Sequence, residues 1–222
     1  MFCSLLIVFP EEMMSKKVTI PREYAVTIID YCNKDLVPND NFDPKTEYHS
    51  NWFENQFSFV SDQDLKKQLG MAFYQARFIY KLMSALRLPR FKHYGIVKFQ
   101  IIQYASICEA VITHLVKERF FFQLRLHLKN SPSEKGKKKR SKLRNPNLRD
   151  YIDVAIAQGL ISSATGDGIK GLYQVRNNVH LLRASKLSYK PKLYEAIDGY
   201  NLVKNMIAEI EDFDKVQNSI SN

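Results

Sequence analysis

The stretch IIQYASICEAVITHLV, residues 101–116, decides the fold of this chain. Together with the residues before it, it carries apolar side chains at spacings of four, three, four, three and four. These positions are Val97, Ile101, Tyr104, Cys108, Val111 and Leu115. Such a period lines one side of an α-helix with apolar groups. The stretch therefore predicts a helix over about residues 92–129 that is packed into a core.

A second long helix is predicted immediately before this one, over about residues 61–88. Ser61 and Asp62 supply an N-terminal cap signal, and Pro89 breaks the pattern. The expected core positions are Leu69, Ala72, Ala76, Ile79, Met83 and Leu86. Because the connection between the two helices is so short, they must pack antiparallel as an αα-hairpin.

Further helices are predicted after residue 146. Asn147 caps a shorter helix, LRDYIDVAIAQGL, and Gly159 helps to end it. Thr165 or Asp167 begins the next helix, and Pro191 is expected as the first residue of the last one. The last helix is expected to bury Leu193, Ile197, Tyr200, Val203, Ile207 and Ile210.

The pattern as a whole predicts an all-α protein, an up-and-down bundle of four or five helices. The bundle occupies residues 61–218, and residues 1–60 form an irregular N-terminal extension with aromatic anchors such as Trp52 and Phe53. Two interpretations of residues 1–13 stay open. One is a mis-assigned translation start or a disordered arm, since Met13 and Met14 precede the polar stretch SKKVTIP. The other is an apolar segment docked on the bundle.

Composition narrows the classes of function. The apolar start is too short to span a bilayer and lacks the features of a signal peptide, so no membrane partner is expected. Cys3, Cys32 and Cys108 are odd in number and far apart, which indicates neither a disulfide framework nor a zinc site. Free thiols are typical of a reducing compartment, so we expect a cytoplasmic protein with no metal and no cofactor.

Positive charge is concentrated in one segment. From Lys129 to Arg149 there are nine basic residues and one acid, Glu134, which accounts for +8 of the net charge of +10. Most of this segment, residues 130–146, has no hydrophobic period and is expected to be a loop. The candidate RNA-binding residues in it are Lys135, Lys137, Lys138, Lys139, Arg140, Lys142 and Arg144. Such a density of charge attracts phosphate backbones. A merely solvated loop is the equal alternative, and the lack of interleaved aromatic residues argues against sequence specificity.

The stretch LYQVRNNVHLLR, residues 172–183, holds the candidate catalytic groups. Besides the core stripe of its helix, a second stripe contains Ile169, Tyr173, Arg176 and His180 at spacings of four, three and four. Arg176 and His180 are therefore one turn apart on a face that borders the core. Partial burial there would tune a histidine for acid–base chemistry. The alternative is structural: an arginine at the edge of the core and a histidine bonded to a backbone carbonyl.

The order of a helix containing SICEA, a helix IDVAIAQGLIS and the turn RNNVH before a closing helix resembles the HEPN-like superfamily, particularly its bacterial defence and abortive-infection members. The resemblance covers roughly residues 65–213. It implies a helical bundle that forms a homodimer, and many such proteins are metal-independent ribonucleases. Their signature is an arginine, a polar residue and, after about four to six intervening residues, a histidine. Here His180 follows Arg176 after three intervening residues.

The resemblance implies a site made of Arg176, Asn177 and His180. In it His180 would move a proton, Arg176 would stabilise charge on the phosphate, and Asn177 would orient the scissile group. Glu109 and Tyr173 are the supporting residues, and Glu109 is expected to pair with Arg176. Two functions remain: a ribonuclease effector in a defence or toxin–antitoxin setting, or a non-catalytic module that dimerises and binds RNA, an antitoxin or another partner protein. The short arginine–histidine spacing favours the second.

Overall fold

The computed structural model describes residues 50–86, 90–130, 145–179 and 189–220, together with five single positions between 23 and 32. All regular secondary structure in these residues is helical, which confirms the predicted all-α class. The helices are α2 (Ser50–Asn55), α3 (Gln63–Ala85), α4 (Arg90–Arg119), α5 (Phe121–Asn130), α6 (Leu148–Ala157), α7 (Ser163–Asn178) and α9 (Leu193–Ile220). Residues 1–13 and 131–144, and the interpretations placed on them, lie outside the described part.

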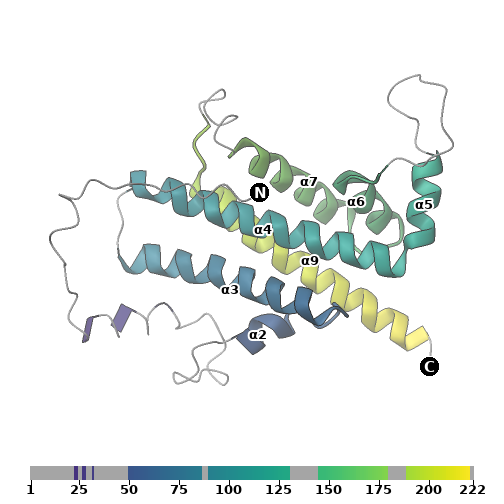
Figure 1. The fold of residues 1–222 in the computed structure, drawn as a ribbon, viewed down its shortest axis with the longest axis horizontal. Helices are drawn as coiled ribbons and strands as arrows, with labels where there is room; N and C mark the ends of the chain where they lie inside the picture. Colours follow the sequence, from purple (N-terminus) through teal and green to yellow (C-terminus); the bar gives the residue numbers. More distant parts are fainter. Residues whose placement is uncertain are drawn as a thin grey trace, which may run out of the picture.

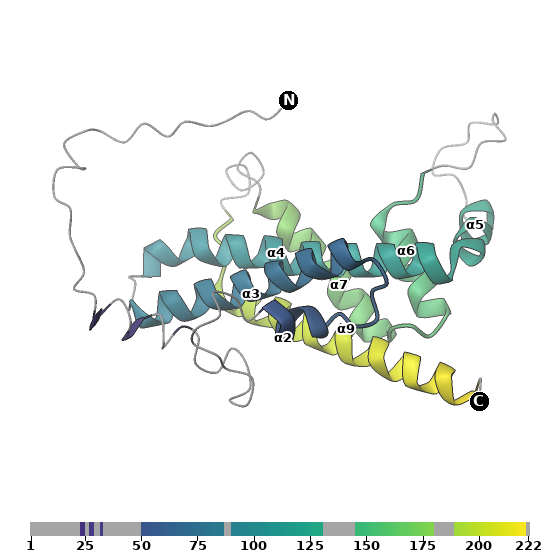
Figure 2. The same ribbon diagram turned by 60° about the horizontal axis from the view of Figure 1, so that its bottom comes forward.

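Four long helices form an up-and-down bundle around α4 (Figure 1). α3 and α4 are antiparallel neighbours, α7 runs back along α4, and α9 crosses beneath it in the same direction as α4. The short helix α6 packs on α4 and α7 near one end of the bundle, where α5 turns away from the axis (Figures 1 and 2). α2 lies against α3.

The core of the bundle follows the pattern of α4. All six of its predicted core residues are at most 1% exposed, which confirms the predicted buried face of α4. α4 is also the one helix in the described residues that is long and apolar enough to cross a membrane by length and composition, over Tyr94–Arg119. Half of its most apolar window is buried by neighbouring helices, and the core helices of water-soluble proteins meet the same criterion.

The predicted helix over 92–129 is two helices, which corrects the sequence interpretation and is one reason that the described residues form seven helices rather than four or five. α4 ends at Arg119 and α5 begins at Phe121. The break lies at Phe120, whose ring packs edge-on against Phe213 of α9 at 6.2 Å. Beyond the break α5 packs on α6, and Leu124 and Leu128 are buried in the core.

Local capping signals located several helix ends. The side chain of Asp62 accepts hydrogen bonds from the first backbone amides of α3, and Asn147 and Asp150 form a reciprocal capping box at the start of α6. Gly159 adopts φ 71° just after α6, as expected of a glycine that ends a helix. The predicted start of the next helix at Thr165 or Asp167 was wrong.

α7 begins at Ser163, because Ser162 is its N-cap and accepts a hydrogen bond from the amide of Thr165. Glu209 of α9 fixes this cap by accepting hydrogen bonds from the backbone and the hydroxyl of Ser162. The start of α7 is thereby bonded to α9, and this contact is not visible in the local sequence.

The last helix also begins later than predicted, at Leu193 rather than Pro191. Leu193 and Ile197, predicted to be buried, are 37% and 41% exposed. The first half of α9 buries the preceding positions, Ala196 and Gly199, so its buried face is rotated by one residue from the predicted stripe. The buried face of α9 consists of Ala196, Gly199, Val203, Met206, Ile207 and Ile210.

Candidate functional site

Arg176 lies in the last turn of α7, where its guanidinium is held from two sides. Its Nη1 donates a 2.8 Å hydrogen bond to Oε2 of Glu109 on α4, and its Cζ lies 5.0 Å from the centre of the Tyr173 ring. A cation is also favoured at this position by the partial negative charge of a helix C-terminus. The pairing of Glu109 with Arg176 expected from the sequence is present.

This ion pair orients the arginine more than it stabilises the fold. The side chains of Arg176 and Glu109 are 25% and 38% exposed. Pairs so accessible to water contribute about 0–1 kcal/mol to stability. A guanidinium carries five N–H donors in a fixed fork. Within the described part of the chain Arg176 donates one side-chain hydrogen bond, to Glu109, which leaves it donors for a phosphate.

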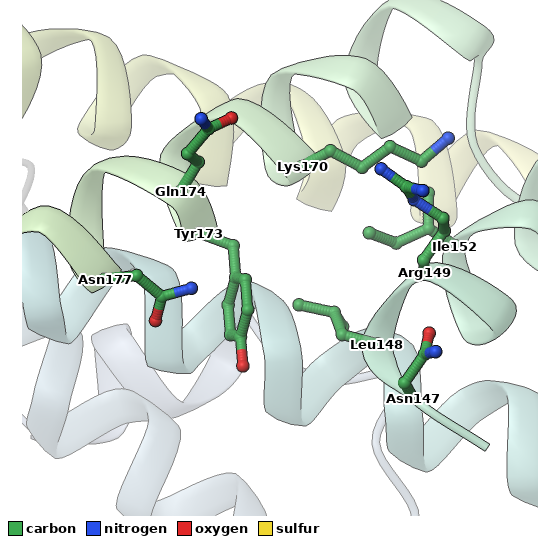
Figure 3. Close-up of a pocket in the computed structure, with 8 residues that line it drawn as sticks. All are labelled: Asn147, Leu148, Arg149, Ile152, Lys170, Tyr173, Gln174 and Asn177. Atoms are coloured by element: carbon green, nitrogen blue, oxygen red, sulfur yellow. The ribbon is translucent and has the colours of Figure 1, made fainter.

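Asn177 faces a different part of the molecule from its neighbour Arg176. It lines a groove of about 380 Å³ between α6 and α7. The lining side chains are Asn147, Leu148, Arg149, Ile152, Lys170, Tyr173, Gln174 and Asn177. In Figure 3 the ring of Tyr173 hangs beside the amide of Asn177, and Lys170 extends along α7 toward Arg149. Tyr173 therefore belongs to both places: its ring contacts the Arg176 cation and also forms a wall of the groove.

The charge of the groove is balanced rather than strongly positive. Lys170 is paired with Asp153 at 2.9 Å and with Asp167 at 3.5 Å. Arg149 is exposed on the first turn of α6. Carboxamides and the tyrosine hydroxyl supply the remaining polar groups, and Leu148 and Ile152 supply apolar surface. This composition suits a polar planar group better than a bare anion.

Sequence reasoning missed most of the groove. Lys170, Tyr173, Gln174 and Asn177 follow one another at spacings of three, one and three, which places them on one face of α7. That spacing was a usable signal. What faces them depends on how α6 packs, and the sequence alone does not define this packing.

The structure does not place all of the predicted site. His180 and the seven RNA-binding candidates of the basic segment lie outside the described residues. Among the described residues, no group of three or more histidine, cysteine, aspartate or glutamate side chains is arranged to hold a metal ion. His114 contacts Ser61 and Glu118, each at 3.3 Å, and His127 contacts Asp150 at 3.4 Å.

Comparison of the chain with protein-family models, with curated proteins and with solved structures finds no match.

Proposed function

We propose that this protein binds RNA and cleaves it without a metal ion, using Arg176, Asn177 and His180. The observation that carries the proposal is the orientation of Arg176. Glu109 and Tyr173 fix its guanidinium at the end of α7, and the adjacent Asn177 lines a groove of nucleotide size. An oriented arginine beside a polar groove is what stabilisation of a phosphate in a transition state requires.

The proposed reaction is an internal displacement at phosphorus. The 2′-oxygen of the RNA bonds to the phosphorus atom as the bond to the 5′-oxygen breaks. His180 removes the 2′-hydroxyl proton, and a second His180, from the other copy in a homodimer, protonates the departing 5′-oxygen. Arg176 stabilises the added negative charge, and the products carry a 2′,3′-cyclic phosphate and a 5′-hydroxyl. This chemistry would act in the cytoplasm as a defence or toxin–antitoxin effector.

A second candidate is a non-catalytic HEPN-like module that dimerises and binds RNA or a partner protein. The ion pair itself favours this candidate, because Glu109 neutralises Arg176 in the single chain. Removing Glu109 separates the two functions. If Arg176 is catalytic, losing the group that orients it lowers the cleavage rate. If the pair is only structural, its loss lowers the stability of the protein by about 0–1 kcal/mol and changes nothing else.

The test uses single-stranded RNA or transfer RNA in the presence of a chelator, with detection of cyclic phosphate ends. Wild type should cleave, and His180→Ala should not. Glu109→Ala should lower kcat about 10- to 100-fold, within the range seen when a catalytic group is misplaced by about 1 Å. His114→Ala is the matched control, since this histidine contacts Ser61 and Glu118 rather than α7. Wild-type cleavage no faster than that of His180→Ala would exclude catalysis and leave the binding module.

The basic segment has its own test within this proposal. Replacing Lys137–Arg140 by serine should weaken RNA binding and reduce its dependence on salt, because each phosphate contact releases a counterion. Unchanged affinity would leave the segment as a solvated loop.

A further inference from the structure

α5 presents an exposed face at the end of the bundle. In Figures 1 and 2 it projects from the end of α4 beside α6. Phe121, Phe122 and Leu126 are 56%, 75% and 49% exposed. Leu124 and Leu128, on the side of the helix next to Phe121, are buried and anchor α5. Three large exposed apolar side chains on one short anchored helix make this face a candidate for recognition.

Two cations lie within this face. At about 100° per residue, the order around the helix is Phe121, Arg125, Lys129, Phe122 and Leu126, over an arc of about 140°. The Cζ atom of Arg125 lies 5.7 Å from the centre of the Phe121 ring. α5 contains no acidic residue, and the described residues provide no salt bridge to Arg125 or Lys129. The face thus places two positive charges between two aromatic rings.

The two cations between the rings distinguish among three occupants. A helix that lies in a bilayer keeps its cations on the polar side and its apolar side continuous. Here Arg125 and Lys129 lie in the middle of the apolar arc. A second copy of the chain would bury Lys129 with no acidic partner on α5, and lysine is depleted from interfaces. A single nucleic acid strand offers bases to the two rings and phosphates to the two cations between them.

We infer that the exposed face of α5 is a stacking platform for single-stranded RNA. The rings of Phe121 and Phe122 stack with unpaired bases, and Arg125 and Lys129 contact the intervening phosphates. The inference rests on the proposed function in one respect, that RNA is the ligand. It adds a second RNA contact at the end of the bundle, where the basic segment begins.

The test measures binding of a fluorescent 2′-O-methyl uridine 20-mer, which has no 2′-hydroxyl and is therefore bound without being cleaved. Phe122→Leu keeps an apolar side chain but removes the ring, and it should weaken binding roughly 5- to 100-fold, as loss of one stacked base does. Phe122→Tyr should restore affinity. Arg125→Gln should reduce the salt slope by about one. Tyr194→Leu is the matched control, because Tyr194 is 55% exposed on α9 and also has a lysine near its ring.

An abasic oligomer with the same phosphates separates stacking from charge. Wild type should bind it at least as weakly as Phe122→Leu binds the uridine oligomer, because stacking on both rings is lost. Wild type and Phe122→Leu should bind the abasic oligomer equally. Equal RNA affinities for wild type and Phe122→Leu would overturn the platform. So would vesicles of anionic phospholipid whose binding Phe122→Leu weakens, or a dimer in RNA-free solution that Phe122→Leu converts to a monomer.

The platform and the proposed catalysis fail separately. Cleavage with no dependence on Phe122 would refute the platform and leave catalysis standing. Binding that depends on the ring of Phe122, without any cleavage, would refute catalysis and leave the platform standing.

Discussion

Replacing Gly70 by alanine should destabilise the protein, although alanine is the better residue in a helix. Gly70 lies inside α3, and a Cβ atom there would meet the backbone nitrogen of Glu54 at 2.8 Å and its Cα at 3.0 Å. Alanine gains about 1 kcal/mol over glycine in helix propensity. Overpacking costs about 1–3 kcal/mol, and the upper value applies because the obstacle is the backbone of α2 rather than a movable side chain. The net loss is about 2 kcal/mol.

Gly171 is the matched control, because it makes the same chemical change without the contact. It lies inside α7, and a Cβ atom there meets nothing within 4 Å. Gly171→Ala should therefore stabilise the protein by about 0.5–1 kcal/mol. For a domain of this size, Gly70→Ala should lower Tm by about 4–8 °C and Gly171→Ala should raise it by about 1–4 °C. Thermal unfolding followed by far-UV circular dichroism measures both. Equal shifts of the same sign would refute the close approach of α2 and α3.

Two further predictions concern buried polar and thiol groups. Asp150→Ala removes the acceptor for the backbone amide of Asn147 at 2.8 Å and the contact with His127, and should lower the free energy of unfolding by about 1–2 kcal/mol in urea titrations. Asp153→Ala, at a more exposed ion pair, should cost less than about 1 kcal/mol, and equal losses would contradict the reasoning. Burial raises the pKa of the Cys108 thiol to about 12, so maleimide should label it only after unfolding, as read by peptide mass spectrometry. Labelling of the native protein would contradict the burial of Cys108. Because the thiol ionises at lower pH in the unfolded chain, its contribution to the free energy of unfolding should be complete below about pH 9 and be lost as the pH rises toward 12.

The parts of the fold that local chemistry specifies were predictable. The period of α4 identified its buried face, and Asp62 and Asn147 located two helix starts, because a cap satisfies the backbone of its own helix. The break at Phe120 was not predictable, since its ring packs against Phe213 from the far end of the chain. The exposure of Ile197 was missed for the same reason: which face of α9 is buried at this point, that of Ala196 and Gly199, depends on the neighbouring helices.

The candidate site likewise has parts that the sequence predicts and parts that depend on tertiary packing. The Glu109–Arg176 pair could be expected once two helices were known to pack, because each residue borders its helix's core stripe. The polar face of Tyr173, Gln174 and Asn177 is visible in the spacing of α7. The groove itself requires the N-terminal turn of α6 opposite that face, and this placement follows from tertiary packing alone.

The contact between His127 and Asp150 has a consequence for the chain between α5 and α6. It joins two helices that are separated in sequence by the 17 residues 131–147. The packing of α5 on α6 therefore fixes the distance between the two ends of this segment. Doubling the length of a closed chain segment costs only about 0.6 kcal/mol in chain entropy. Insertions, deletions and changes of charge between residues 131 and 146, which leave the Asn147 cap in place, should therefore be thermodynamically cheap. The length and charge of this connection can then change while the bundle keeps its stability.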